Sequence, residues 1–138
     1  MKKSAREYRY DLITIIYKHQ LLEDEINIPL LVKEYELTPL QAKQLEIYNE
    51  KYAFLEGIIS KNLSKNWTFI RINFLLRAIL LLGTIELIYS NPKIIINEMI
   101  EIARDYSFSE REVKFVNGIL DSIRREISDI KKRTNAES

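Results

Sequence analysis

Apolar residues recur at helical spacing along nearly the whole chain, and few residues interrupt the pattern. Only three Gly and three Pro occur in 138 residues, so helix-breaking positions are rare. Between about Ser4 and Gln20, apolar positions three and four residues apart form one stripe: Ala5, Tyr8, Leu12, Ile15 and Ile16. Nearly every other long segment has this period rather than the alternation of a strand. The sequence therefore predicts an all-α fold.

Capping residues divide the chain into separate helices. Ser, Thr and Asn accept hydrogen bonds from the first backbone N–H groups of a helix, and Pro fits its first turn. These signals predict a short helix around Ile28 to Tyr35, a long helix from Thr38-Pro39 past Ile59, a very apolar helix from Phe74 to Tyr89 after Asn73, and a helix from Asn91-Pro92 to about Asp105. Because the helix at 74–89 is apolar on all sides, we expect the other helices to surround it.

The last helix contains the one conflict between local signals. Asn117-Gly118 between apolar residues is a hairpin signal. Ser109 and Glu112, however, match a capping box, and the apolar residues that follow share one helical stripe: Val116, Ile119, Leu120, Ile123 and Ile127. We therefore expect a helix with Asn117 and Gly118 near its middle, although Gly costs about 1 kcal/mol relative to Ala there.

Composition favours one globular domain in a reducing compartment. With 46% hydrophobic residues, the chain can bury a core of its own, and we expect a single domain at residues 1–130. The segment 131–138 lacks a large apolar residue and is expected to be a mobile tail. The absence of Cys excludes disulfides and favours the cytoplasm.

We expect no association with a membrane. The start of the chain has basic residues but no apolar signal segment behind them. The most apolar stretch, at 78–85, is far shorter than the ~20 residues that span a bilayer, so it predicts a buried core helix.

No pattern in the sequence indicates catalysis. His19 is the only histidine, and a lone His without Cys gives no basis for a zinc site. Glu98 and Glu101 are neighbours on one helix face and could form an acid–base pair, but a solvated acidic face is the simpler interpretation. Gly-rich phosphate loops and nucleophile motifs are absent. We expect no enzyme, no catalytic residues, no metal site and no cofactor.

Charge is distributed unevenly, and a first basic group lies at the start of the chain. The net charge is only +1, but residues 1–21 carry five basic and two acidic side chains, while residues 22–56 carry three basic and eight acidic ones. If the first helix extends to the terminus, Lys2, Arg6 and Arg9 share one face, with Lys3 beside them and Tyr10 one turn beyond Arg6. Cations neutralise phosphates and rings stack on unpaired bases, so this mixture suits single-stranded RNA. An ordinary solvated first turn is the alternative.

A second basic group lies on the last predicted helix. Arg111, Lys114 and Phe115 are spaced so that an aromatic ring lies beside two cations. Glu110 and Glu112 reduce the local charge, and Phe115 could instead belong to the core, so this group supports RNA binding only together with the first.

Several short fragments follow one another in a characteristic order along almost the whole chain. They are Leu12 to Tyr17 at the end of an arginine-containing first helix, Asn66-Trp67, Arg71-x-Asn73, Arg77-Ala78-Ile79-Leu80, Glu86-Leu87, Ile96-Asn97-Glu98, Ile102-Ala103 and Lys114 to Asp121. Each fragment is modest alone. In this order and at these spacings, the sequence resembles the NusB family of transcription antitermination factors.

This resemblance implies a fold, a function and a site. Members of the family are compact bundles of about seven helices in two small subdomains. They bind boxA RNA with the ribosomal protein NusE, in a transcription elongation complex that reads through terminators, notably in rRNA operons. Arg6 and Arg9 match the arginine-rich first helix that meets RNA, Tyr17 matches its tyrosine, and Lys114 and Phe115 match late-helix residues near the same RNA. The predicted RNA-binding residues are Lys2, Lys3, Arg6, Arg9, Tyr17, Arg111, Lys114 and Phe115.

The chain departs from the family pattern at positions that bear on binding. Ala5 and Glu7 stand where the first helix tends to be basic, which implies weaker attraction for RNA. Leu76 and Leu81 stand where an acid and an arginine are common, so the usual NusE and RNA contacts of the central helix are left open. Arg111 occupies an often acidic position, which adds attraction for phosphate.

Alternatives remain for function and assembly. The RNA-binding module of rRNA cytosine methyltransferases resembles NusB, although we expect no catalytic domain here, and the chain has no Cys. A helical protein adaptor of the same fold with weakened or lost RNA binding would fit the small number of arginines. The resemblance allows both a monomer and a homodimer whose interface can cover the RNA surface.

Asn117 and Gly118 have two interpretations as well. Gly118 would permit close approach of another helix, and Asn117 would hydrogen-bond a neighbour such as Asn97. The alternative is direct contact with RNA. We expect the structural role, because buried polar residues are usually satisfied within the fold.

Overall fold

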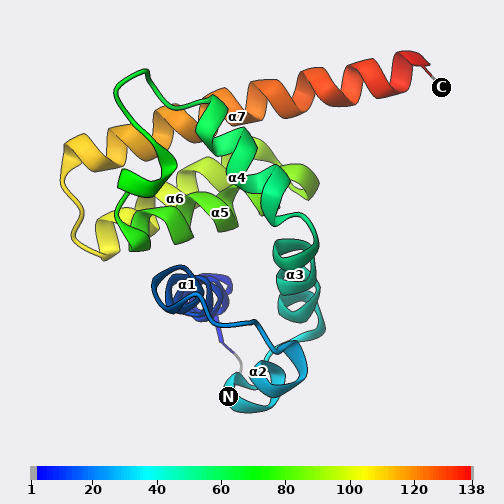
Figure 1. Ribbon diagram of the computed structural model, residues 1–138, viewed down its shortest axis with the longest axis vertical. Helices are drawn as coiled ribbons and strands as arrows, with labels where there is room; N and C mark the ends of the chain where they lie inside the picture. The colour runs from blue at the N-terminus through cyan, green and yellow to red at the C-terminus, as the bar shows by residue number, and fades with distance from the viewer. Residues whose placement is uncertain (1–2, 138) are drawn as a thin grey trace.

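Helices form almost the entire protein. The computed structural model describes residues 3–137, and within that range it contains seven α-helices, one 3-10 turn and no strand. The elements are α1 (Ala5–Leu22), α2 (Ile28–Tyr35), α3 (Pro39–Glu50), α4 (Tyr52–Lys61), η1 (Phe69–Arg71), α5 (Phe74–Tyr89), α6 (Pro92–Asp105) and α7 (Glu110–Glu137), as Figure 1 shows. The predicted all-α fold is confirmed.

Side-chain caps begin several helices, the predicted ones at Asn73 and Ser109 among them. Ser4 accepts from the Glu7 N–H, and the Glu7 carboxylate accepts from the Ser4 N–H in return. Asn73 accepts from the second and third residues of α5, and the Ser109 hydroxyl accepts from the Glu112 N–H as a capping box requires. These local bonds satisfy backbone groups that the helix itself leaves free.

One predicted helix is in fact two. The segment expected to run unbroken from Thr38-Pro39 past Ile59 bends at Lys51, whose backbone leaves helical geometry at φ −112° and ψ 19°. The bend allows α3 to pack on α1 while α4 packs on α5 and α7. The aromatic packing continues across the bend, because the rings of Tyr48 and Tyr52 meet edge to face with centroids 5.4 Å apart.

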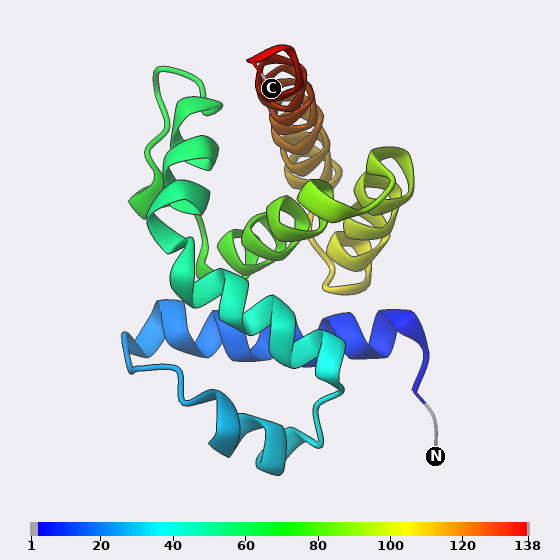
Figure 2. The same cartoon turned by 90° about the vertical axis from the view of Figure 1, so that its right-hand side faces the viewer.

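Helix α5 is the centre of the bundle, as predicted. Every residue from Leu76 to Leu87 is buried, and α5 contacts α1, α3, α4, α6 and α7. Figures 1 and 2 show two groups of helices: α1, α2 and α3 lie together at one end, and α4 to α7 form the larger part. Both groups meet on α5, so the core is continuous between them.

Helix α7 crosses residue 130 without a break and projects beyond the bundle to Glu137 (Figure 1). Residues 131–137, predicted as a tail, are therefore helical, which fits the Lys, Arg, Ala and Glu they contain. Lys131 Nζ donates to the Ile88 carbonyl at 2.7 Å. Mobility of the segment stays a prediction. Among the described residues, no helix is both long and apolar enough to cross a membrane.

The expected packing role of Gly118 is wrong. A Cβ atom built on Gly118 would meet nothing within 4 Å, and no hydrogen bond joins Asn117 to Asn97, although both exposed side chains line one groove. The close helix approach occurs at Gly83 instead, where a Cβ would lie 3.1 Å from Leu120 Cδ2 and 3.3 Å from Met99 Cγ. Packing thus explains Gly83, whereas Gly118 faces open space.

This difference predicts opposite effects of one added methyl group. Gly118→Ala should raise the free energy of unfolding by about 1 kcal/mol, because Ala is the better helix former, and should raise the melting temperature by about 4 °C. Gly83→Ala should be less stable than Gly118→Ala by about 1 to 3 kcal/mol, because its methyl overpacks Leu120 and Met99. Gly57→Ala, which is also open, is the control. Thermal and urea unfolding would measure the stability of all three variants. Equal gains in stability for Gly83→Ala and Gly118→Ala would contradict the close helix approach at Gly83.

Candidate nucleic-acid interface

Two adjoining hollows bring several of the predicted site residues to one region of the surface. Each has a volume of about 500 Å³. The first, which we call the Tyr17 hollow, lies between α1, the start of α5 and the loop after α6, and its lining includes Tyr17, Phe74, Tyr106 and Phe108. The second, the Trp67 hollow, lies between the segment before α5 and the start of α7, and its lining includes Trp67, Arg71, Arg111 and Phe115. Asn73, the cap of α5, lines both.

The Trp67 hollow contains an aromatic pair flanked by cations. The rings of Trp67 and Phe115 have centroids 5.5 Å apart and are tilted by 44°. The Arg71 guanidinium lies over the Trp67 ring at 5.8 Å from its centroid, and Arg111 lines the same hollow. Trp67 is 43% exposed, so part of the ring is free to stack on another flat group.

A buried arginine holds this segment in position. Arg77 of α5 donates to the Ile72 and Ile70 carbonyls at 2.9 and 2.5 Å. Its guanidinium also lies over the rings of Phe69 and Phe74, at 5.2 and 4.4 Å from their centroids. Carbonyl and ring contacts together stabilise a charge that burial would otherwise penalise. Because Arg77 ties η1 to α5, it also sets the position of the neighbouring Arg71 and Trp67.

The late-helix cations differ in position and are both available. With 3.6 residues per turn, Arg111 and Phe115 face the Trp67 hollow, whereas Lys114 lies on the side of α7 nearer α6 and does not line that hollow. Within the described residues, neither Arg111 nor Lys114 makes a hydrogen bond or ion pair, and both are exposed. The structure therefore brings two of the three predicted residues together and leaves both cations free for an anionic ligand.

The first-helix arginines are engaged within the fold. Arg6 holds Glu98 with two hydrogen bonds of 2.7 and 3.2 Å, and Arg9 holds Glu86 with two of 2.8 Å. The Arg6 guanidinium lowers the pKa of the Glu98 carboxyl below its ordinary value, chiefly through the hydrogen bond. These bidentate pairs tie α1 to α5 and α6, so the predicted basic face of α1 is largely neutralised by carboxylates.

Lys3, which precedes α1, does not extend this face. Helix α1 begins at Ala5, behind its cap Ser4, so Lys3 lies outside the helix and pairs with Asp11 at 2.8 Å. Lys2 lies outside the described residues. Tyr10 donates to Asp105, which also accepts from Arg6 at 3.4 Å, so this tyrosine belongs to the ion-pair network rather than to a free stacking surface.

The two unusual leucines of α5 take apolar positions. Leu76 is buried and lines the floor of the Trp67 hollow. Leu81 is 0% exposed and belongs to the core, so its side chain cannot meet a partner from outside. The contact that the family commonly makes at that position is therefore not available through Leu81.

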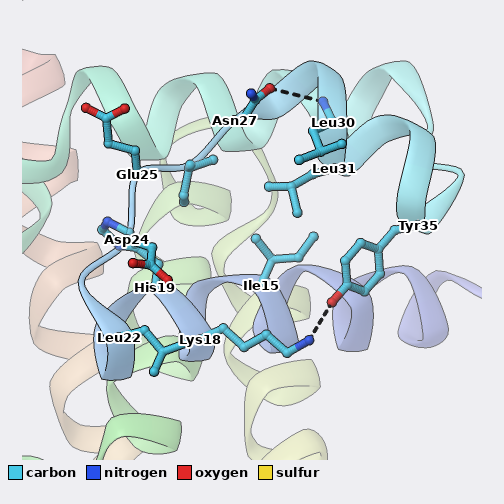
Figure 3. Close-up of a pocket in the computed structure, with 11 residues that line it drawn as sticks. Ile15, Lys18, His19, Leu22, Asp24, Glu25, Asn27, Leu30, Leu31 and Tyr35 are labelled. Atoms are coloured by element: carbon cyan, nitrogen blue, oxygen red, sulfur yellow. Dashed lines mark hydrogen bonds between the residues drawn. The ribbon is translucent and has the colours of Figure 1, made fainter.

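A third hollow, of about 190 Å³, separates α1 from α2 and is a poor ligand site. Figure 3 shows Ile15, Leu30 and Leu31 pointing into it, with two hydrogen bonds among the residues drawn around it. Lys18 Nζ donates to the Tyr35 hydroxyl at 2.9 Å, and Asn27 accepts from the Leu30 N–H at 3.1 Å as the cap of α2. The first of these bonds joins α1 to α2, and the second is local to α2. In the described part of the chain, no acidic, His or Cys cluster could hold a metal ion.

Comparison with known proteins identifies the family. The model of the NusB family matches residues 6–125. The chain belongs to the NusB family. A transcription antitermination protein NusB of Wolinella succinogenes is 35% identical over 132 residues, which cover 90% of this chain and 94% of that protein. The NusB protein of Fervidobacterium nodosum is 51% identical over a shorter alignment of 75 residues, about half of each chain at 52%.

Solved NusB structures share the fold. T. maritima NusB superimposes with a TM-score of 0.77 at 29% identity, over 91% of this chain and 94% of that one. A crystal structure of antitermination factors NusB and NusE in complex with dsRNA matches with a TM-score of 0.72 over 88% of this chain and 96% of that one. Identity to the latter is 22%, so it supports the fold alone.

Sequence reasoning missed Trp67 and Arg71 as parts of the site. Both belong to fragments that carried the NusB resemblance, but neither was assigned a role, because they lie far from Phe115 along the chain. The signal available in the sequence was Trp67 followed four residues later by Arg71, just before the helix cap Asn73. Their meeting with Phe115 depends on the path of the chain between α4 and α5, which no local pattern encodes.

The ion pair of Arg9 with Glu86 yields a prediction about stability. The two side chains are only 18% and 8% exposed, so Arg9→Ala leaves a carboxylate buried without a partner. Removing one partner of a buried pair costs about 3 to 5 kcal/mol, and chemical denaturation should measure a loss of this size. Adding Glu86→Gln to Arg9→Ala should recover part of it, because the amide is neutral.

The control for this experiment is Lys3→Ala, which breaks a more exposed pair and should change stability little. If Arg9→Ala unfolds at the same denaturant concentration as the wild type, the pair does not hold α1 in place.

Proposed function

We propose that the protein is a transcription antitermination factor that acts by binding boxA-type single-stranded RNA together with NusE, and not by catalysis. The observation that carries the proposal is the Trp67 and Phe115 ring pair with Arg71 and Arg111 beside it, in a chain of the NusB family. Aromatic faces with neighbouring cations match what an unpaired RNA strand offers, namely bases to stack and phosphates to neutralise. The complex acts in the cytoplasm, on RNA polymerase during elongation.

The hollows suggest distinct roles for their residues. Trp67 or Phe115 stacks on a base, and Arg71, Arg111 and Lys114 neutralise phosphates. Tyr17 presents its ring from the adjoining hollow, which continues the surface toward α1.

Among the remaining predicted residues, Arg6 and Arg9 act mainly by orienting α1 through their ion pairs, with the partly exposed Arg6 adding attraction. Lys2 and Lys3 add positive charge near the same end of α1.

NusE is the proposed protein partner. A solved NusB of the same fold is in complex with NusE and dsRNA, and we extend that partner to this chain because the chain belongs to the NusB family. Leu76 replaces a common acid at the surface of α5, so we propose that an apolar contact on the floor of the Trp67 hollow replaces a polar one there. A homodimer whose interface covers the two hollows would exclude RNA.

A protein adaptor that has lost RNA binding is the second candidate, and one observation favours it. The carboxylates of Glu86, Glu98 and Asp105 occupy the first-helix arginines, so the region expected to attract RNA most strongly is close to neutral. An adaptor of this kind would bind NusE without RNA.

The two candidates predict different binding. Titration of boxA-type RNA at low salt, with and without NusE, should show RNA binding that NusE strengthens. An adaptor would bind NusE and leave RNA unbound in both titrations. Mass measurement of the mixtures would report which assembly forms.

Phosphate and base contacts should separate by their dependence on salt. Arg111→Ala should weaken binding of all RNAs alike and lower the slope of log affinity against log salt by about 0.7, as expected when one phosphate contact of a single strand is lost. Phe115→Ala should lower affinity by about 1 to 3 kcal/mol with little change in slope, if the ring stacks on a base.

Matched controls are available among residues that line neither hollow. Phe54 is an exposed ring on α4, and Lys43 is an exposed cation on α3. Phe54→Ala and Lys43→Ala should leave affinity and slope unchanged. A Phe115→Ala protein that melts normally and binds with full affinity would remove Phe115 from the site.

A further inference from the structure

Asn117 and Gly118 have no role within the fold that accounts for them. Both are poor helix formers inside α7, about two turns from its start, and no contact among the described residues compensates for them. Gly118 faces open space, and within the described residues the Asn117 carboxamide makes no hydrogen bond. The same is true of Asn97 on α6, whose exposed carboxamide lines the same groove as Asn117.

The groove between α6 and α7 is large enough for a ligand. Its volume is about 570 Å³, within the usual range of about 300 to 1,000 Å³ for ligand sites. Ile96 and Ile100 form an apolar floor, and Asn97 and Asn117 add polar groups from the two helices. A carboxamide offers a donor and an acceptor side by side, the arrangement that pairs with the edge of a base.

The groove also has an excess of positive charge. Asp121 is its one carboxylate, and two guanidinium groups share it: Arg124 at 2.8 Å and Arg125 at 3.7 Å. Lys93 lies at the opposite wall, and Lys114 precedes Asn117 by one turn on the same side of α7. Neither lysine is paired within the described residues. An anionic partner therefore fits this groove better than a neutral or acidic peptide.

Gly118 joins this groove to the Trp67 hollow. At 3.6 residues per turn, Gly118 lies on the outer face of α7 between Phe115, which faces the Trp67 hollow, and Asn117, which faces the groove. Since Gly118 has no side chain, the outer surface of α7 is recessed at this point. A flexible strand lying in the hollow can cross α7 there and enter the groove.

We propose that the groove between α6 and α7 is a second contact for the RNA strand, in which Asn97 and Asn117 hydrogen-bond a base while Lys93 and Arg124 meet its phosphates. This inference rests on the proposed function, because the strand reaches the groove from the Trp67 hollow. It assigns a role to the Asn-Gly pair: Gly118 lets the strand pass, and Asn117 reads the base beyond it.

Two RNAs test the proposal in the full-length protein. One is a boxA-type RNA just long enough to fill the two hollows, and the other is the same RNA extended by a few unpaired nucleotides at both ends. Fluorescence anisotropy should show that the wild type binds the extended RNA about tenfold more tightly, the order expected for one well-formed base contact. Asn117→Ala, Asn97→Ala and Gly118→Ala should each remove most of this gain and leave the short RNA unaffected. Abasic nucleotides in the extension should reduce the extra affinity of the wild type for the extended RNA. With such an RNA, Asn117→Ala should cause no further loss of affinity.

Gly118→Ala is the sharpest of these variants, because it adds one methyl group and should make the protein more stable rather than less. Its control is Gly57→Ala, at an equally open helical glycine on α4. This variant should gain stability and keep the full difference in affinity between the two RNAs. If the difference persists in Gly118→Ala and Asn117→Ala, the groove does not bind RNA. If those variants lose NusE and retain the RNA difference, the groove is a protein contact and the inference is wrong. If neither RNA binds the wild type, the proposed function itself fails.

Discussion

Helix α5 is apolar on every side, and the rest of the molecule is arranged to enclose it. Its residues from Leu76 to Leu87 are all buried, which no single partner helix could achieve. Five helices therefore pack around it, and one of these contacts is close enough to need Gly83, where Leu120 and Met99 leave no room for a methyl group. Because the enclosing helices come from both ends of the chain, α5 also joins the two parts of the fold.

Enclosing α5 places ionised groups where they must be paired. Glu86 is buried on α5, and Arg9 of α1 holds it with two hydrogen bonds. Arg6 and Glu98 form a similar pair beside it. Breaking the pair of Arg9 and Glu86 leaves a buried charge without a partner, which disfavours any packing of α1 that separates the two side chains. The two ion pairs also remove two arginines from the surface available to RNA, so the late helix and the segment before α5 supply most of the free positive charge of the candidate site.

The candidate site lies where the start of α5, α7 and the preceding segment converge. Arg77 anchors that segment through carbonyls and aromatic rings, and Trp67 thereby meets Phe115. The sequence identified Tyr17, Arg111 and Phe115 as residues of one surface, and the structure brings them to adjoining hollows. It did not identify Trp67 or Arg71, and it did not anticipate that carboxylates would hold Arg6 and Arg9, because these contacts join positions far apart along the chain.

What the sequence determined by itself is local. Helical periodicity, the caps at Thr38, Asn73 and Ser109, and the apolar character of α5 depend on residues within about four positions of one another, so they could be predicted along with the family resemblance. The bend at Lys51, the ion pairs of α1 and the difference between Gly83 and Gly118 were decided only by the tertiary structure. Whether a glycine meets a neighbouring helix or open space depends on which helix surfaces pack together. The close packing of the whole core decides this, and the residues next to the glycine in the sequence do not.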